Sequence, residues 1–228
     1  IYVLVDFHSH HAEQHEARAI DFFTRIAQKY GKQPNLIYEI YNEPLDKTDW
    51  TSVIKPYAER VIQAIRAVDP DNLIIVGTQS WSQDVDKAAD DPLVNGHNVA
   101  YSLHFYANTH KEELRKKALY AIHKGLPIVV TEWGSVSATG DGQVNSQEVL
   151  YWFGLIERNQ LSHANWSVSD KKEGASIFKP GRSKQSQWTD ADLSTSGLLA
   201  KTLISTMAKN NAANGSVASC RVPKPVQQ

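Results

Sequence analysis

Apolar and polar positions follow a repeating strand-then-helix order along the chain. Residues 1–7 are apolar and β-branched, which is typical of a buried strand. Residues 13–30 follow with apolar side chains at helical spacing. The same order then recurs to the end of the chain. We predict strands over residues 1–7, 35–41, 73–77, 99–105, 128–131 and 163–167, and helices over residues 13–30, 53–68, 83–89, 111–124, 146–159 and 194–209.

This alternation predicts a parallel sheet with helices packed outside it. An open doubly wound sheet and a (β/α) barrel both fit. No glycine-rich phosphate loop follows an early strand, which weakens a nucleotide-binding interpretation. In a barrel, functional side chains lie at the carboxyl ends of several strands. Each predicted strand here ends in, or is followed by, a histidine, glutamate or tryptophan: His8, Glu43, Trp81, His104, Glu132 and Trp166. We therefore predict an α/β fold of the (β/α)8 TIM-barrel type.

A complete barrel of this type has eight strands, and the pattern shows six. We expect the six units to be strands 3 to 8, with two units of roughly 70–90 residues missing before residue 1. The opening run Ile1-Tyr-Val-Leu-Val, which begins as a strand, agrees with this expectation. Exposed edges at the first and last strands would favour a homo-oligomer or domain exchange.

Composition excludes several classes of protein. Hydrophobic residues make up 41% and charged residues 21%, as in ordinary globular domains. The net charge of -1 gives no electrostatic reason to expect nucleic acid or an anionic membrane as a partner. No apolar run approaches the roughly 18 residues of a membrane span. The single cysteine, Cys220, forms no internal disulfide. The sequence becomes small and low in complexity after Lys209, so we predict a catalytic domain at 1–209 and a linker-like tail at 210–228.

Two glutamates at strand ends carry the candidate chemistry. Glu43 lies in Tyr-Asn-Glu-Pro and Glu132 in Thr-Glu-Trp-Gly. Glycoside hydrolysis needs two carboxyl groups that flank the scissile bond, about 5–5.5 Å apart in retaining enzymes. An apolar strand that ends in glutamate is costly unless the charge is used or paired. The plainer alternative is that each glutamate is the first solvated residue after its strand. Two such glutamates with aromatic neighbours favour catalysis.

The two motifs resemble the signatures of glycoside hydrolase family 5. Other segments are similar to that family's bacterial endoglucanases, and the similarity extends to about Lys209. They are Asp6-Phe-His8-Ser-His10, Trp81-Ser-Gln, Ser-Leu-His104-Phe-Tyr106 and Asn165-Trp166-Ser-Val-Ser-Asp-Lys171. The resemblance implies a retaining endo-β-1,4-glucanase that hydrolyses cellulose and soluble β-glucans by double displacement. Such an enzyme would be secreted, because its polymeric substrate cannot enter a cell.

The resemblance also implies residue roles. Glu43 would be the acid/base and Glu132 the nucleophile. The Tyr106 hydroxyl would orient Glu132, and Asn42 would bind the substrate 2-hydroxyl. An arginine that the family places after its second strand would precede residue 1. The implied substrate-binding residues are His8, Asn42, Trp81, His104, Tyr106, Trp166, Lys171 and Glu173. The resemblance implies no cofactor and no metal.

Other interpretations remain open at this stage. The run His8-Ser-His10-His11 is also typical of barrel hydrolases that bind zinc, but a metal site leaves both glutamates and Trp166 unexplained. A carbohydrate-binding remnant with little catalysis, or a hydrolase of mannan or mixed-linkage glucan, would carry the same motifs. Among the remaining side chains we predict His97, His110 and His123 on the surface, His163 and Trp152 in the core, and Trp188 either at the cleft or over the core.

Overall fold

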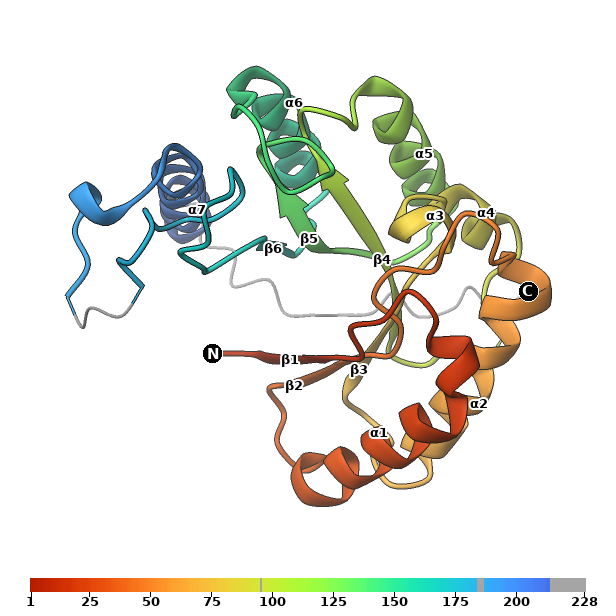
Figure 1. Ribbon diagram of the computed structural model, residues 1–228. Helices are drawn as coiled ribbons and strands as arrows, with labels where there is room; N and C mark the ends of the chain where they lie inside the picture. The colour runs from red at the N-terminus through yellow and green to blue at the C-terminus, as the bar shows by residue number, and fades with distance from the viewer. Residues whose placement is uncertain (95, 184–186, 214–228) are drawn as a thin grey trace. The chain divides into compact units, whose positions relative to one another are not determined.

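The computed structural model describes residues 1–94, 96–183 and 187–213. Within these residues the chain forms one six-stranded sheet whose strand order follows the sequence (Figure 1). Neighbouring strands from β1 to β4 are parallel. The strands are β1 (Val3–Asp6), β2 (Leu36–Glu39), β3 (Leu73–Val76), β4 (Val99–Tyr106), β5 (Ile128–Gly134) and β6 (His163–Asn165).

A helix follows each strand in the described chain, which confirms the predicted alternation. The helices are α1 (Glu16–Tyr30), α2 (Lys55–Arg66), α3 (Gln79–Ser82), α4 (Val85–Asp90), α5 (Glu112–His123), α6 (Ser146–Arg158) and α7 (Thr195–Ala213). Short 3-10 turns at Ala12–His15 and Asp190–Asp192 precede α1 and α7. Among these helices none is long and apolar enough to cross a membrane, within the part of the chain that the structure describes.

The chain divides into two compact units. The first comprises Ile1–Phe105, His110–Trp133 and Leu161–Ala164, and so holds almost all of the sheet. The second comprises Tyr106–Thr109, Gly134–Gln160 and the described residues from Asn165 onward.

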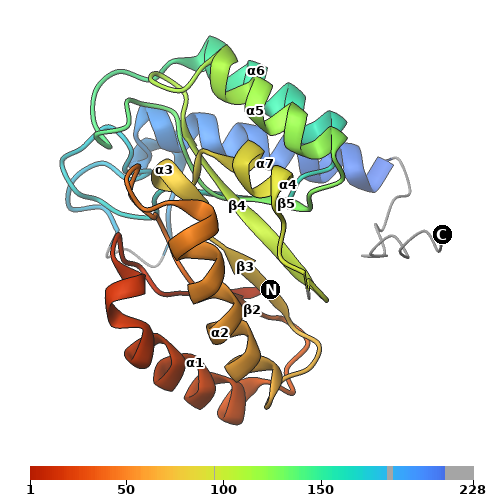
Figure 2. The same cartoon turned by 90° about the vertical axis from the view of Figure 1, so that its right-hand side faces the viewer.

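Helices α1 and α2 pack side by side in the first unit (Figure 2). The buried face of α1 presents Ala19, Phe23 and Ala27, which recur every four residues as the helical period requires. The Phe23 ring meets the ring of Tyr38 on β2 edge-to-face, with centroids 6.1 Å apart. The helix therefore rests on the sheet through the apolar stripe that its sequence predicts.

The helix predicted over 53–68 begins earlier than its periodicity indicates. A π-helical turn, Trp50–Ile54, precedes α2. The Asp49 carboxylate accepts a hydrogen bond from the Ser52 backbone N–H at 2.8 Å and so caps this turn. The turn starts at its cap rather than at the first residue of the apolar stripe.

A left-handed turn follows β3 where the sequence predicted only loop and a short helix. Ser80, Trp81 and Ser82 have φ values of 59°, 56° and 57°. These are unusual for residues with a Cβ atom and mark a locally constrained backbone. The Trp81 N–H donates to the Pro44 carbonyl at 2.7 Å, and the Ser82 hydroxyl donates to the Asn42 carbonyl at 2.7 Å. The turn thus clamps the loop that follows β2.

Gly77 fixes the same loop from the end of β3. A Cβ atom at this position would lie 2.0 Å from the Tyr41 carbonyl oxygen and 3.0 Å from Pro44. Any side chain would therefore push the two backbones apart. The segment that carries Glu43 is therefore held between Gly77, which has no side chain, and the Ser80–Ser82 turn.

The second unit is built on an aromatic cluster and two helices. The Tyr106 ring lies over Gly134, where an added Cβ would come within 2.3 Å of it. Val136 and Ala175 complete the cluster, and Trp166 packs against it. In α6, Trp152 is fully buried, which confirms its predicted packing role.

Helix α7 runs to Ala213 and so passes the boundary predicted at Lys209. Residues 214–228, including Cys220, lie outside the described residues. The linker-like tail over 210–228 therefore stays a prediction.

Candidate active site

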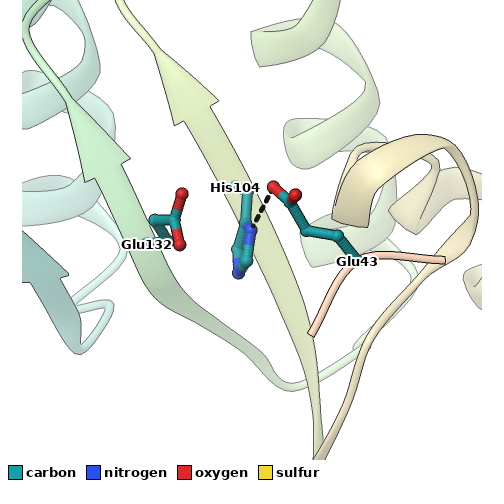
Figure 3. A group of neighbouring side chains, drawn as sticks. All are labelled: Glu43, His104 and Glu132. Atoms are coloured by element: carbon teal, nitrogen blue, oxygen red, sulfur yellow. Dashed lines mark hydrogen bonds and ion pairs between the residues drawn. The ribbon is translucent and has the colours of Figure 1, made fainter. Parts of the chain in front are cut away.

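Three ionisable side chains meet at the carboxyl ends of the strands in the first unit. Glu43 follows β2, His104 lies in β4 and Glu132 lies in β5. One carboxylate oxygen of each glutamate and one ring nitrogen of His104 all lie within 4.8 Å of one another. Figure 3 shows the imidazole ring between the two glutamates. One oxygen of each glutamate thus lies as near the other as the carboxyl groups of retaining glycosidases, which are roughly 5–5.5 Å apart, whereas those of inverting enzymes are roughly 6.5–9.5 Å apart.

Glu43 is held by two histidines. Its Oε1 lies 2.9 Å from His104 Nδ1, and its Oε2 lies 3.1 Å from His10 Nε2. Burial raises the pKa of Glu43, but the hydrogen bond and positive charge of His104, with a smaller effect of His10, leave that pKa below its ordinary value. The free site therefore favours an ionised Glu43 next to a protonated histidine.

His104 is buried, with only 2% of its surface exposed. Its Nε2 lies 2.9 Å from the Thr131 hydroxyl, so both ring nitrogens are engaged. Burial lowers the pKa of His104, but its interactions with Glu39 and Glu43 and the charge of Glu132 outweigh burial and raise that pKa to about 10. A positive charge consequently lies between the two glutamates at neutral pH.

Glu39 is a buried carboxylate that sequence reasoning missed. It lies in β2, is 3% exposed, and its Oε1 accepts hydrogen bonds from Thr131 at 2.6 Å and Ser102 at 2.8 Å. That oxygen is 3.8 Å from His104 Nε2, which is an ion-pair distance but too long for a hydrogen bond. The available signal was a charged residue inside the apolar run Leu36-Ile-Tyr-Glu-Ile-Tyr, since glutamate is seldom buried without a partner.

A second histidine–carboxylate pair lies at the end of β1. His8 Nδ1 is 2.7 Å from Asp6 Oδ2. Burial raises the pKa of Asp6 to about 6, although His8 acts against it. The hydrogen bond to Asp6 raises the pKa of His8, and the charges of Glu132 and Glu43 add to that effect. The predicted residue His8 is thus part of the same electrostatic cluster as the two glutamates.

The family model described as cellulase (glycosyl hydrolase family 5) matches residues 1–172. The chain belongs to glycosyl hydrolase family 5. This finding confirms the predicted family, and the six strands in sequence order confirm a partial (β/α)8 barrel.

Known proteins are similar to this chain in sequence and structure over most of its length. Endoglucanase Z of Dickeya dadantii is 56% identical over 180 residues, which cover 79% of this chain and 42% of that protein. A structure from Cytophaga hutchinsonii has a TM-score of 0.89 at 44% identity and covers 93% of this chain and 70% of that one. The catalytic domain of Thermobifida fusca endoglucanase Cel5A, in complex with cellotetraose, has a TM-score of 0.83 at 33% identity, with 91% and 70% covered. The chain spans less than half the length of the curated relatives.

Two further predicted residues of this family 5 chain lie near Glu43: Asn42 precedes it in the clamped loop, and Trp81 lies on the turn that clamps this loop. Asn42 is buried, and its Nδ2 has no hydrogen-bond partner among the described residues. Buried amide donors are normally satisfied, so this donor is available to a ligand oxygen. Trp81 is 38% exposed on the left-handed turn that holds the same loop. The turn fixes the backbone of an indole that solvent and ligand can reach.

His110 corrects one prediction. It was expected on the surface, but it is half-buried. Burial lowers the pKa of His110, while Glu43 raises it and His104 lowers it, so the ring lies within electrostatic reach of both. Hydrophobic periodicity could not predict the burial of His110, because this residue lies in the loop between β4 and α5 and so belongs to no strand or helix. His97 and His123 are exposed as predicted, and half-buried His163 accepts a hydrogen bond from the Trp133 indole at 3.2 Å.

The remaining predicted residues of the family 5 site belong to the second unit. Tyr106 and Trp166 form part of its aromatic cluster. Lys171 is exposed and Glu173 half-buried, in a tight turn where the Glu173 N–H donates to the Lys171 carbonyl at 2.8 Å. Trp188, which the sequence left between two roles, is half-exposed and packs on the Phe178 ring with centroids 4.8 Å apart. These two rings help to line a cavity of about 470 Å³ within the second unit.

The Glu43, His104 and Glu132 set has side chains of the kind that bind divalent metals. However, Glu43 and His104 already satisfy each other, and two acidic groups flanking a histidine match the needs of glycoside hydrolysis. No metal is assigned to the site.

Proposed function

We propose that this chain acts as a retaining endo-β-1,4-glucanase on cellulose and soluble β-glucans. The observation that carries the proposal is the pair of glutamates whose oxygens lie within 4.8 Å of each other around His104. This spacing is of the order found in retaining enzymes and below that of inverting ones, so it supports double displacement over single displacement. The names of the relatives support the substrate class, since they are endoglucanases and one is in complex with cellotetraose.

The environments of the two glutamates suit different roles. Glu132 is 8% exposed within β5, and the positive ring of His104 favours its ionised form. An ionised, fixed carboxylate is suited to attack the anomeric carbon and form a glycosyl–enzyme intermediate. Glu43 lies on a loop and exchanges hydrogen bonds with two histidines, which suits an acid that protonates the departing oxygen and then a base that activates water.

The other predicted residues support substrate binding. The unpartnered Asn42 amide is placed to donate to a sugar hydroxyl, and the Trp81 indole offers an exposed aromatic face. In the second unit, we assign Trp166 to an aromatic contact with sugar and Lys171 with Glu173 to sugar hydroxyls, as the family pattern implies, while the orientation of Glu132 by the Tyr106 hydroxyl stays a prediction. The polymeric substrate also implies an enzyme that works outside the cell.

Hydrolysis of carboxymethylcellulose tests the proposal, with Glu132→Gln as the matched control. Solution viscosity should fall well before reducing ends accumulate, because internal cleavage shortens chains faster than it creates ends. The variant should lose both signals. Binding of cello-oligosaccharides without hydrolysis would replace the enzyme with a sugar-binding protein, and faster cleavage of mannan or mixed-linkage glucan would change the substrate. Full activity in Glu132→Gln would overturn the assignment of the nucleophile.

A further inference from the structure

Three histidines follow β1 in the run His8-Ser-His10-His11, and the resemblance to family 5 implies a role only for the first. His10 Nε2 lies 3.1 Å from Glu43 Oε2. The His11 ring instead lies near Glu13, with Nδ1 and Oε1 3.8 Å apart. The two neighbouring histidines therefore have different partners, and the partner of His10 is the proposed acid/base.

Backbone contacts fix the segment that carries His10 against the segment that carries Glu43. The Glu43 N–H donates to the Ser9 carbonyl at 3.3 Å. The Tyr41 hydroxyl donates to the His10 carbonyl at 3.1 Å, and Tyr41 is itself fully buried. The His10 ring thus reaches Glu43 from a backbone that is held at two points.

The two oxygens of Glu43 lie in different surroundings. Oε1 is 2.9 Å from Nδ1 of His104, which is a buried ring. Oε2 faces His10, whose side chain is 49% exposed. Oε2 is therefore the oxygen nearer to solvent. A carboxylate oxygen that accepts one hydrogen bond keeps a second lone pair, so Oε2 can exchange a proton with a sugar oxygen or a water while His10 stays bound.

We propose that His10 is a positioning residue for Glu43, and that its Nε2–H holds Oε2 in the direction from which the proton is transferred. His10 acts on the substrate only through Glu43. The inference rests on the proposed function, because the proton concerned is that of glycoside hydrolysis. The contact between the two side chains does not depend on that function.

The bond from His10 matters most while Glu43 is ionised. In the first step Glu132 forms a bond to the anomeric carbon, the glycosidic C–O bond breaks with its electrons on the departing oxygen, and that oxygen takes the proton from Oε2. In the second step Glu43 removes a proton from the water that displaces Glu132. Between the steps Glu43 is a carboxylate, which can only accept, so the Nε2–H of His10 donates to it and stabilises its charge.

Several ionisable groups besides His10 act on Glu43. Burial raises the pKa of Glu43, while His104 and then His10 lower it. Three further groups lie within electrostatic reach of this carboxylate: His8, His110 and Glu132. His10 differs from His104 in being exposed, so it can be replaced without opening the buried part of the site.

Carbon-13 NMR of the full chain, labelled at the glutamate side-chain carboxyl, tests the contact without reference to activity. The Glu43 signal is assigned by its loss in Glu43→Gln. His10→Ala keeps the carbonyl that Tyr41 binds and removes only the ring, so Glu43 should titrate at higher pH than in the wild type. In His10→Gln, whose neutral amide can donate to Oε2, Glu43 should titrate between the two. His11→Ala is the matched control and should match the wild type.

Identical Glu43 titrations in the wild type and both His10 variants would overturn the inference. His10→Gln decides the question even if His10→Ala fails to fold, because the glutamine removes the charge of the ring and preserves most of its size. A shift of the same size in His11→Ala would also overturn it, since His11 belongs to the same segment and contacts Glu13 instead.

Hydrolysis assays test the orientation of the proton. On carboxymethylcellulose, His10→Ala should lower kcat by about 10-fold to 100-fold, because a hydrogen bond to a charged group is lost, and His10→Gln should recover part of this loss. The alkaline limb of the kcat/KM profile should move to higher pH, since Glu43 keeps its proton longer without His10. Release of the aryl group from an activated cellobioside needs little protonation and should change much less.

An equal loss on both substrates with an unmoved limb would show a purely structural role for His10 and overturn the inference. A wild type without hydrolysis would refute the proposed function. The NMR titrations would then decide by themselves whether His10 holds Glu43.

Discussion

The two units of the chain differ in how their predicted functional side chains are exposed to solvent. In the first unit, Glu39, His104 and Glu132 are buried, and the two carboxylates act against burial to raise the pKa of His104. In the second unit, Lys171 is exposed to solvent, and Trp166 is half-buried against an apolar cluster. Coupled charges away from water control reactivity, while exposed aromatic and polar groups control affinity. Substitutions of the charged residues in the first unit should therefore change kcat and pH dependence, and those of the predicted sugar-binding residues in the second should change KM.

The largest effect is expected for Glu132→Gln. The amide preserves shape and removes the nucleophile, so kcat should fall by at least about 10⁴-fold. Calorimetric titration with cellotetraose should show affinity within a few-fold of the wild type. Loss of binding together with loss of turnover would show that Glu132 contributes to substrate affinity. It would contradict the expectation that the charged residues of the first unit act on kcat.

Glu43→Gln should have a smaller and substrate-dependent effect. Removal of a general acid/base costs about 10²–10⁴-fold in rate. Substrates with good leaving groups need little protonation, so the first step on an activated aryl cellobioside should suffer much less than cleavage of carboxymethylcellulose. Pre-steady-state release of the aryl group measures this difference. An equal loss on both substrates would argue against an acid at this position.

Trp166→Ala tests whether a residue of the second unit acts on KM rather than on kcat. Loss of an aromatic contact with sugar should raise KM up to about tenfold, with kcat little changed, since such contacts contribute about 0.5–1.5 kcal/mol. Trp188→Ala is the matched control, because it removes an indole of the same unit that packs on Phe178. It should leave KM unchanged and lower the free energy of unfolding by about 1 kcal/mol. A larger effect of Trp188→Ala on KM would reverse the two assignments.

The last prediction concerns stability rather than rate. Burial raises the pKa of Asp6 from 3.8 to about 6, so the folded state binds this proton more tightly than the unfolded state. The stabilising effect of the protonated form is present at low pH and is lost as pH rises through about 6. The advantage of Asp6→Asn over the wild type in free energy of unfolding should therefore grow by about 2 kcal/mol from about pH 4 to about pH 7.

Urea denaturation of both proteins at the two pH values measures this difference. If the two proteins differed in free energy of unfolding by the same amount at both pH values, the pKa of Asp6 would not be raised by folding.

The sequence predicts the order of strands and helices because each carries a strong period. The run Leu73–Val76 is apolar and β-branched, the run Val99–Tyr106 is mostly apolar and aromatic, and α1 has a clear stripe through Phe23. Glu43 and Glu132 could also be singled out from the sequence, since each is a charged residue at the end of a buried strand beside aromatic residues, and their catalytic roles stay a prediction. These features depend on neighbours close in sequence.

The features that were missed depend on contacts distant in sequence. Glu39 becomes significant only when Ser102 and Thr131 from other strands meet it. The left-handed Ser80–Ser82 turn contains no glycine, so no local signal marks it, and it is held by the loop after β2. His110 acquires its environment from Glu43 and His104. In each case tertiary structure determines the role of a residue that looks ordinary in its own segment.

Covalent trapping tests the central claim most directly. The chain is incubated with a 2-deoxy-2-fluoro-β-cellobioside that bears an activated leaving group, and the modified peptide is identified by mass spectrometry. A retaining enzyme accumulates the glycosyl intermediate, because the fluorine slows its hydrolysis more than its formation. We predict one cellobiosyl adduct per chain, on Glu132 and absent in Glu132→Gln. An adduct on another residue, or hydrolysis of cellulose without any adduct, would contradict the account.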